Sequence, residues 1–336
     1  MRVAILDDIH DAWRGTQGVK RLRERAEVVI FTKPFGSLSE LRGFDALIAN
    51  RERTKLTREL LSQLKDVRVI AQTGNHAAHL DFKAAADLGI VIAHASGGYS
   101  IGAAELTIGL AQAVMRRIPE CDAALKRGEW PMPLTPVLAG KTLGLVGLGR
   151  LGKHVAGLGR AYGMRVLAWS RTLTDAAAAE SGAERRELDD LLAASDVVSI
   201  HVPLAQSSRN LIDARRLALM KPSAYLINTA RGPIVNESAL VEAIEKRRIA
   251  GAGLDVFDAE PLPKNHPLTK LDNVVLTPHI GWTTDHGYEG FAASAADALL
   301  AYLDGRRCRE PLVAVIGRPA DVRREQIGRA SCRERV

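Results

Sequence analysis

Short hydrophobic runs alternate with longer amphipathic segments along nearly the whole chain. The runs have the length and the β-branched content of buried strands, and the segments between them have helical periodicity. In the first part of the chain we predict strands at 3–6, 28–31, 46–49, 69–72 and 90–93, and helices such as 58–64 and 81–88. This alternation predicts a parallel sheet that helices cover on both faces.

A second series of the same kind follows a long helix, which we predict from Ile101 to about Arg127 with Ser100 as its N-cap. Three prolines then indicate a linker, namely Pro131, Pro133 and Pro136. Further strands are predicted at 142–146, 165–169, 197–200, 224–228, 251–256 and 274–276, with a last helix at 285–303. Six strands in this order match a doubly wound sheet.

The composition is typical of a two-domain globular protein, with 336 residues, 46% of them hydrophobic and 25% charged. No apolar run is long enough to cross a bilayer, and Asp7 and Asp8 follow the first strand too early for a signal peptide. The three cysteines (Cys121, Cys308, Cys332) form no CxxC pair, which favours a cytoplasmic location. Basic residues are scattered and aromatic residues make up only 4%, so the net charge of +7 does not indicate a nucleic-acid partner.

The last ten residues, 327–336, can be written in codons that resemble a common sequencing-library adapter. We therefore treat them as a suspected non-native tail and leave them out of the fold prediction. The alternative is an ordinary basic tail, and resequencing the locus distinguishes the two.

A glycine-rich turn, Gly147-Leu-Gly-Arg-Leu-Gly152, follows an apolar strand and opens a helix. Gly147 permits a tight turn, Gly149 lets a pyrophosphate approach the backbone, and Gly152 lets the helix pack on the strand. Arg150 and Leu151 complete the turn, and the free N–H groups of the helix start attract an anion. The context predicts a dinucleotide-binding site.

The end of the next strand carries Trp169-Ser170-Arg171, where an NAD-binding fold places an acidic residue on the ribose. A carboxylate would repel a 2′-phosphate, whereas a hydroxyl and a guanidinium bind it. Ser170 and Arg171 therefore favour NADP(H). NAD(H) stays possible, with Arg171 as a solvated surface residue.

Three further motifs lie downstream: Asn228-Thr-Ala-Arg-Gly-Pro, Gly253-Leu-Asp-Val-Phe-Asp-Ala-Glu-Pro and Thr277-Pro-His-Ile-Gly-Trp. Together with the glycine turn and His201-Val-Pro-Leu, they resemble the D-isomer-specific 2-hydroxyacid dehydrogenases, which include phosphoglycerate, glyoxylate/hydroxypyruvate and D-lactate enzymes. The resemblance extends from the first strand to about Val313. It implies an NAD(P)-dependent oxidoreductase that reduces small glyoxylate- or hydroxypyruvate-like 2-keto acids to D-2-hydroxy acids, or catalyses the reverse.

The resemblance assigns the catalytic roles to Arg231, Glu260 and His279, and the residue types suit the reaction. A guanidinium can bind both the carboxylate and the carbonyl oxygens of a 2-keto acid. A histidine exchanges protons near neutral pH, and a buried carboxylate fixes its ring and stabilises the imidazolium. The alternatives are that Arg231 is a structural loop arginine, that Glu260 is a turn residue before Pro261 and that His279 is a structural histidine.

The resemblance also implies the contacts to cofactor and substrate. Cofactor contacts are expected at His201, Val202, Pro203, Ser208, Thr229, Ala230, Asp255 and Gly281; for Asp255 the alternative is a carboxylate that caps a turn. Gly74, Asn75 and His76 are the candidates for the substrate loop, although His76 replaces a glycine of the family pattern. His76 and His79 have a spacing that suits a metal, but no third ligand is evident, so we predict no metal site.

The fold class that we predict is α/β, with two doubly wound parallel-sheet (Rossmann-like) domains and an interdomain cleft. Residues 1–99 with 284–326 would form the substrate-binding domain, and 100–283 the NAD(P)-binding domain. Cleft closure would exclude water from the reaction. By family analogy, the helix from Ile101 would pack in a homodimer.

Two other functions stay open. Nicotinamide-sensing corepressors share the fold and the Arg, Glu and His residues but act as scaffolds, and turnover of glyoxylate or hydroxypyruvate would exclude a pure scaffold. A formate dehydrogenase needs no proton transfer, so the pair of Glu260 and His279 argues against it.

Overall fold

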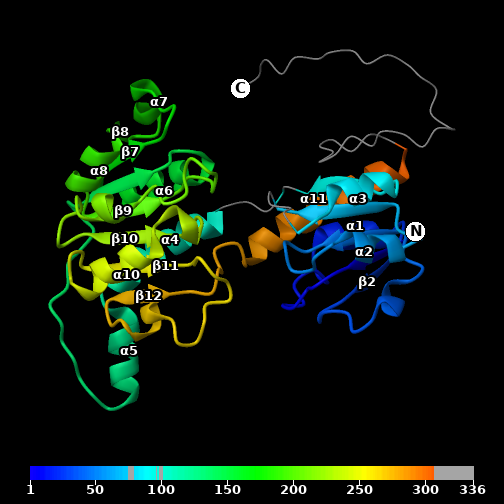
Figure 1. Ribbon diagram of the computed structural model, residues 1–336, viewed down its shortest axis with the longest axis horizontal. Helices are drawn as coiled ribbons and strands as arrows, with labels where there is room; N and C mark the ends of the chain where they lie inside the picture. Colours follow the sequence, from blue (N-terminus) through cyan, green and yellow to red (C-terminus); the bar gives the residue numbers. More distant parts are fainter. Residues whose placement is uncertain (75–78, 96, 98–100, 306–336) are drawn as a thin grey trace. The chain divides into compact units, whose positions relative to one another are not determined.

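The structure of the protein is a computed structural model, and it describes residues 1–74, 79–95, 97 and 101–305. The chain divides into two compact units: unit 1, residues 1–98 with the segment that starts at Tyr288, and unit 2, residues 99–287. Each unit contains one parallel sheet, which confirms the predicted fold class of two parallel-sheet α/β domains (Figure 1). The units divide at 98/99 and 287/288, within a few residues of the predicted domain boundaries at 99/100 and 283/284. The suspected tail lies outside the described residues.

Unit 1 contains a five-stranded parallel sheet in the order β2-β1-β3-β4-β5. Its strands are β1 (Arg2–Ile5), β2 (Glu27–Ile30), β3 (Ala46–Ala49), β4 (Val69–Thr73) and β5 (Val91–Ala95). Its helices are α1 (Gln17–Arg23), η1 (Leu38–Leu41), α2 (Arg58–Gln63), α3 (Phe82–Asp87) and most of α11 (Asp285–Leu303). The backbones of α1 and α11 touch, because a Cβ on Gly18 would lie 2.2 Å from the carbonyl of Ala292. The last helix is therefore part of the core of unit 1.

Unit 2 contains a seven-stranded parallel sheet in the order β12-β11-β10-β9-β6-β7-β8. Its strands are β6 (Thr142–Val146), β7 (Arg165–Trp169), β8 (Glu184–Arg185), β9 (Val197–Ile200), β10 (Tyr225–Asn228), β11 (Gly251–Leu254) and β12 (Val274–Leu276). The order of the strands reverses between β6 and β9. Ligands of doubly wound sheets bind at the carboxyl ends of the strands at such a switch point.

The helices of unit 2 cover both faces of this sheet. They are α4 (Ile101–Met115), α5 (Ile118–Lys126), α6 (Arg150–Ala161), α7 (Asp175–Glu180), α8 (Leu188–Ala194), α9 (Ala214–Leu217) and α10 (Glu237–Glu245), with the short turns η2 (Gly232–Ile234) and η3 (Pro267–Lys270). One core cluster joins α4 and α6 to the sheet, and the other joins α8, α9 and α10. The central strands β6, β9, β10 and β11 are buried on both faces, as their largely hydrophobic sequences predict.

Two details of the predicted elements were wrong. The predicted single helix from Ile101 to Arg127 is two helices, because Arg117 has a left-handed backbone conformation with a φ of 53°. Pro119 is the reason: in a continuous helix its ring would clash with the carbonyl of Met115. The strand β8 was missed, since two residues at a sheet edge carry too little pattern. The predicted N-cap, Ser100, lies outside the described residues.

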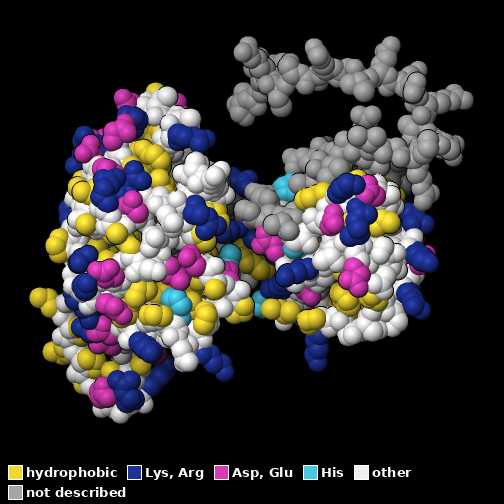
Figure 2. All heavy atoms as spheres, viewed as in Figure 1, with side chains coloured by type: hydrophobic (Ala, Val, Ile, Leu, Met, Phe, Trp, Pro, Cys, Tyr) yellow, Lys and Arg dark blue, Asp and Glu magenta, His cyan; other side chains and the backbone are white. Residues whose placement is uncertain are grey.

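The surface shows mixed charge. On the face of unit 2 in Figure 2, basic and acidic side chains are interspersed rather than gathered by sign. Among the described helices, none combines the length and the apolar composition that a membrane span requires.

Candidate active site

The motifs found in the sequence lie at the carboxyl ends of the central strands of unit 2. Gly147 follows β6 and His201 follows β9, on the two sides of the switch point. Thr229, Asp255 and Thr277 follow β10, β11 and β12. Because all these strands are parallel, their carboxyl ends share one edge of the sheet. The fold therefore gathers residues that are far apart in the sequence.

The glycine turn has the shape of a phosphate cradle. Gly147 has a φ of +112°, and a Cβ there would meet the backbone of His201 at 2.7 Å. A Cβ on Gly152 would lie 2.2 Å from the carbonyl oxygen of Gly147, whereas one on Gly149 would meet no described atom within 4 Å. Helix α6 starts directly after Gly149, so the backbone N–H groups of its first turn point toward the glycine turn. An open backbone at Gly149 and the positive end of the helix dipole fit the pyrophosphate of a dinucleotide.

The end of β7 presents polar groups without a carboxylate. Ser170 is partly buried and Arg171 is exposed directly after Trp169. The turn is held from two sides: Leu173 N–H donates to the carbonyl of Ser170 at 3.1 Å, and Arg185 Nε donates to the carbonyl of Leu173 at 2.9 Å. The first acidic residue, Asp175, begins helix α7. A hydroxyl and a guanidinium are thus the polar side-chain groups that directly follow β7.

His201 is a neutral histidine that packs against the glycine turn. Its Nε2 lies 2.8 Å from Ser199 Oγ, and its Nδ1 is buried without a partner among the described residues. Burial lowers the pKa of His201 to about 3. The ring therefore adds no charge beside a bound phosphate.

Ser208 uses its hydroxyl within its own loop. The Oγ accepts from Ala205 N–H at 2.8 Å and donates to the carbonyl of Pro203 at 2.7 Å. It thereby holds the turn that follows Val202. The predicted contact of Ser208 with the pyrophosphate stays a prediction.

Glu260 and His279 form a hydrogen-bonded pair. His279 Nδ1 lies 2.7 Å from Glu260 Oε2, and the side chains are 26% and 36% exposed. Phe257 N–H donates to the other oxygen, Oε1, at 3.0 Å. Burial alone raises the pKa of Glu260, but the bonds from His279 and Phe257, and the charges of His279 and Arg231, outweigh it and lower the pKa. An ionised carboxylate thus orients the imidazole and leaves Nε2 on the other side of the ring.

The loop of Arg231 is shaped by the last residue of β10. Asn228 Oδ1 accepts from Ala230 N–H at 3.0 Å, and Asn228 Nδ2 donates to the carbonyl of Arg231 at 2.9 Å. Thr229 Oγ is 2.8 Å from Thr107 Oγ of helix α4. Gly232, the residue after Arg231, packs on the carbonyl of Phe257, and Phe257 N–H donates to Glu260, so the arginine loop lies against the turn that holds Glu260 and His279.

Asp255 holds the turn that carries His279. This carboxylate is 1% exposed and accepts from Thr277 Oγ at 2.5 Å, from Ile280 N–H at 2.8 Å and from Gly281 N–H at 2.9 Å. His279 lies between these donors with a φ of 55°, a left-handed conformation that costs a branched or bulky residue energy. The geometry matches the turn-capping alternative for Asp255, and the contact of Asp255 with a cofactor stays a prediction.

The candidate substrate loop is described only at Gly74, whereas Asn75 and His76 lie outside the described residues. Gly74 follows β4 with a φ of +80°, and a Cβ there would lie 2.1 Å from Nη1 of Arg51. The guanidinium of Arg51 also lies 5.8 Å above the ring of Phe291. In the described part of the chain, no three acidic, histidine or cysteine side chains are grouped as metal ligands.

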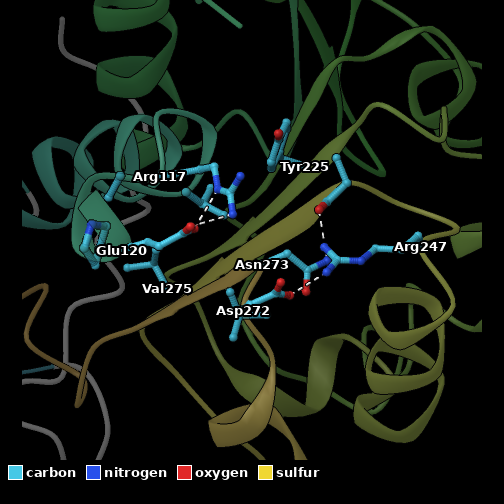
Figure 3. Close-up of a pocket in the computed structure, with 12 residues that line it drawn as sticks. Arg117, Glu120, Tyr225, Arg247, Asp272, Asn273 and Val275 are labelled. Atoms are coloured by element: carbon cyan, nitrogen blue, oxygen red, sulfur yellow. Dashed lines mark hydrogen bonds and ion pairs between the residues drawn. The ribbon is translucent and has the colours of Figure 1, made fainter. Parts of the chain in front are cut away.

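A cavity of about 270 Å³ lies at the amino ends of the strands, opposite the ends that carry the candidate active site (Figure 3). Its lining includes Tyr225 and Asn273, at or near the amino ends of β10 and β12. Its two arginines are already paired, Arg117 with Glu120 at 2.6 Å and Arg247 with Asp272 at 2.5 Å. This cavity is therefore separate from the candidate active site at the carboxyl ends of the strands.

Sequence reasoning missed the residues that hold the site in place. These are Thr107, Asn228, Arg51 and, as described below, Glu237 and His266. Asn228 gave a signal, because a polar residue that ends a buried strand needs hydrogen-bond partners nearby. Thr107 lies within an apolar helix and gave none.

Residues 108–281 match the model of the D-isomer specific 2-hydroxyacid dehydrogenase family, NAD binding domain. The chain is 40% identical to a glyoxylate reductase of Thermofilum pendens over 301 residues, which cover 86% of this chain and 88% of that one. It is 35% identical over 310 residues to a D-3-phosphoglycerate dehydrogenase of Methanocaldococcus jannaschii, covering 91% of this chain and 58% of that one. A solved structure of a putative D-3-phosphoglycerate dehydrogenase oxidoreductase from Ralstonia solanacearum superposes with a TM-score of 0.81 at 35% identity, covering 90% and 94% of the two chains.

Proposed function

The chain belongs to the D-isomer specific 2-hydroxyacid dehydrogenases, and from this membership we propose that it reduces small 2-keto acids such as glyoxylate or hydroxypyruvate to D-2-hydroxy acids, or catalyses the reverse. The observation that carries the proposal is the 2.7 Å bond between Glu260 and His279, with the loop of Arg231 packed on the turn that holds Glu260. A guanidinium, an imidazole and a carboxylate are the groups that the reaction needs.

In the proposed mechanism, Arg231 binds the carboxylate of the substrate and polarises its carbonyl oxygen. His279 donates the proton from Nε2 to the forming alkoxide, and in oxidation the neutral ring accepts it. Glu260 keeps the ring oriented and stabilises its protonated form through Nδ1. The nicotinamide, when bound, supplies or accepts the hydride. The turn from Gly147 to Gly152 would hold its pyrophosphate.

Replacing the acid/base residue tests this function. We expect His279→Gln to lower kcat for glyoxylate by about 10²- to 10⁴-fold, since proton transfer in the transition state is lost. Cofactor binding, measured by fluorescence titration, should be retained. The matched control is His286→Gln, which changes an exposed histidine of the first turn of α11. Near-normal turnover of the His279→Gln variant would refute the assignment, whereas turnover by the wild type excludes a pure scaffold.

We propose NADP(H) as the preferred cofactor. Ser170 and Arg171 are the polar groups at the end of β7, and a guanidinium binds a 2′-phosphate where a carboxylate would repel it. The measurement is kcat/KM for NADPH and for NADH in the wild type and in Arg171→Ala. We expect the variant to lose activity with NADPH and to change little with NADH. A clear NADH preference of the wild type would overturn this proposal.

We also propose a homodimer that packs through the segment predicted as one helix, Ile101 to Arg127, which is α4 and α5 in the structure. Helix α4 is covered within its own chain and leaves only Ile101, Glu105 and Gly109 exposed. Six exposed large apolar side chains lie on α5 and on the segment that follows it: Ile118, Leu125, Trp130, Met132, Leu134 and Val137. A second copy would bury them.

Light scattering on the wild type tests the dimer directly, and a monomer would contradict it. Leu134 is fully exposed, so Leu134→Glu should dissociate the dimer without unfolding the chain. A cytoplasmic location also stays a proposal from the cysteine content, and cell fractionation tests it.

A further inference from the structure

A second carboxylate binds the turn that carries Glu260. Phe257 N–H donates to Glu260 Oε1 at 3.0 Å, and the next amide, Asp258 N–H, donates to Glu237 Oε2 at 3.1 Å. Glu237 is the first residue of helix α10, so it reaches the turn from another element. Two consecutive amides are thus held by two carboxylates, one in the proposed catalytic pair and one outside it.

His266 ties the far end of the same segment to Glu237. Its Nε2 lies 3.0 Å from Glu237 Oε1, and its Nδ1 accepts from Leu268 N–H at 3.3 Å. Because a backbone N–H can only donate, Nδ1 is an acceptor, and the ring proton therefore lies on Nε2 and points at Glu237. The side chains of His266 and Glu237 are only 15% and 20% exposed. Glu237 thereby holds both Asp258 and His266, which flank Glu260 in the sequence.

The peptide that Glu237 binds also supports the loop of Arg231. A Cβ on Gly232 would lie 2.1 Å from the carbonyl carbon of Phe257 and 2.6 Å from the nitrogen of Asp258. Gly232 directly follows Arg231, so the backbone of the arginine loop packs on the peptide group between Phe257 and Asp258. A shift of this peptide would move the supports of Arg231 and of Glu260 together.

From these contacts we infer that Glu237, with His266, is a positioning residue that sets the geometry of the catalytic pair and of Arg231. The inference rests on the proposed function. Glu237 acts through the peptide between Phe257 and Asp258, and among the described residues it makes no hydrogen bond to Arg231, Glu260 or His279. A displacement of about 1 Å in such a support costs catalysis up to about 10²-fold.

The test is Glu237→Gln, which replaces one carboxylate oxygen of Glu237 by an amide NH2 group. In Glu237→Gln a single oxygen remains for two donors, so the bond to Asp258 N–H or the bond to His266 is lost. His266→Gln alone should be milder, because its amide can still donate to Glu237. In the double variant the amide of one glutamine can donate to the oxygen of the other, so we expect its loss of kcat to be smaller than the product of the two single losses. The matched control is Glu242→Gln, which changes an exposed glutamate of the same helix paired with Lys246.

Three measurements separate positioning from simple loss of folded protein. We expect Glu237→Gln to lower kcat about 10- to 100-fold while KM for the cofactor stays within about twofold. The pH profile of kcat/KM should move toward that of Glu260→Gln, whereas partial unfolding would lower the activity equally at every pH. Hydrogen exchange of the peptide that covers residues 257–266 should become faster.

The exchange measurement can overturn the inference even without an enzyme assay, and the assay adds a second way to overturn it. Unchanged exchange at 257–266 in Glu237→Gln would overturn it, even if no 2-keto acid were turned over by the wild type. Faster exchange with a wild-type kcat and pH profile would also overturn it, because loosening the turn would then have no effect on the reaction. A wild type that turns over no 2-keto acid refutes the proposed function, and the exchange result then decides whether Glu237 holds the turn.

Discussion

Replacing His201, whose Nδ1 is buried, by glutamine should make unit 2 less sensitive to acid. Burial lowers the pKa of His201 from its ordinary value of 6.5 to about 3. Between these two pH values the unfolded chain binds a proton that the folded chain does not. The stabilising contribution of the neutral ring is therefore complete above pH 6.5 and is lost as the pH falls toward 3.

The magnitude follows from proton linkage. Each pH unit within this window changes the free energy of unfolding by about 1.4 kcal/mol for one such group. Between pH 6.5 and pH 5.0 the wild type should lose about 2 kcal/mol through His201 alone. Glutamine can keep the hydrogen bond to Ser199 but has no proton to gain in this range. The His201→Gln variant should therefore lose about 2 kcal/mol less than the wild type over the same interval.

Urea unfolding at pH 7.5, 6.5 and 5.0 measures this difference. Trp130, Trp169 and Trp282 belong to unit 2 and Trp13 to unit 1, so fluorescence in a Trp13→Phe background reports the unfolding transition of unit 2. His10→Gln, which removes an exposed histidine of unit 1, is the control. The reasoning is refuted if His201→Gln and the wild type lose equal stability between pH 6.5 and 5.0.

Three further predictions concern close contacts and a buried carboxylate. Gly152→Ala places a Cβ 2.2 Å from the carbonyl of Gly147, so it should lower the free energy of unfolding by about 1–3 kcal/mol. It should also weaken cofactor binding, measured by titration calorimetry, at least tenfold. The control Gly157→Ala in the same helix has open space around its Cβ and should change neither quantity. Asp255→Asn leaves one oxygen for the donors Thr277, Ile280 and Gly281, so it should cost about 1–3 kcal/mol in urea unfolding, and an unchanged midpoint would show that these bonds contribute little. Gly18→Ala forces α1 away from Ala292 and should lower the melting temperature of unit 1 in calorimetry, whereas Gly15→Ala, which meets no described atom within 4 Å, should leave it unchanged.

The strands of unit 2 could be predicted because each buried strand is a continuous hydrophobic run. The segments Thr142–Val146, Arg165–Trp169 and Val197–Ile200 have the predicted bounds. The break at Arg117 was missed, because Pro119 suits the first turn of a new helix as well as the kink of a long one. Periodicity alone does not distinguish these two cases.

The proposed catalytic residues could be found from their motifs, but their partners could not. The bond between Glu260 and His279 was expected, because the family resemblance names both residues. Glu237 and His266 gave no signal, because a glutamate at the start of a helix and a histidine in a proline-rich loop are ordinary surface residues in a sequence. Only the tertiary structure brings them to within 3.0 Å of each other.

The placement of helix α11 has a consequence for how the chain folds as it is made. Unit 1 closes around Tyr288 and Phe291 of this helix, which is synthesised only after the whole of unit 2. The sheet of unit 1 is therefore synthesised before one of its packing helices, while unit 2 can complete its core from contiguous residues. We expect the amino-terminal sheet to be the last to gain protection from proteases during translation, the reverse of the usual order for nascent domains.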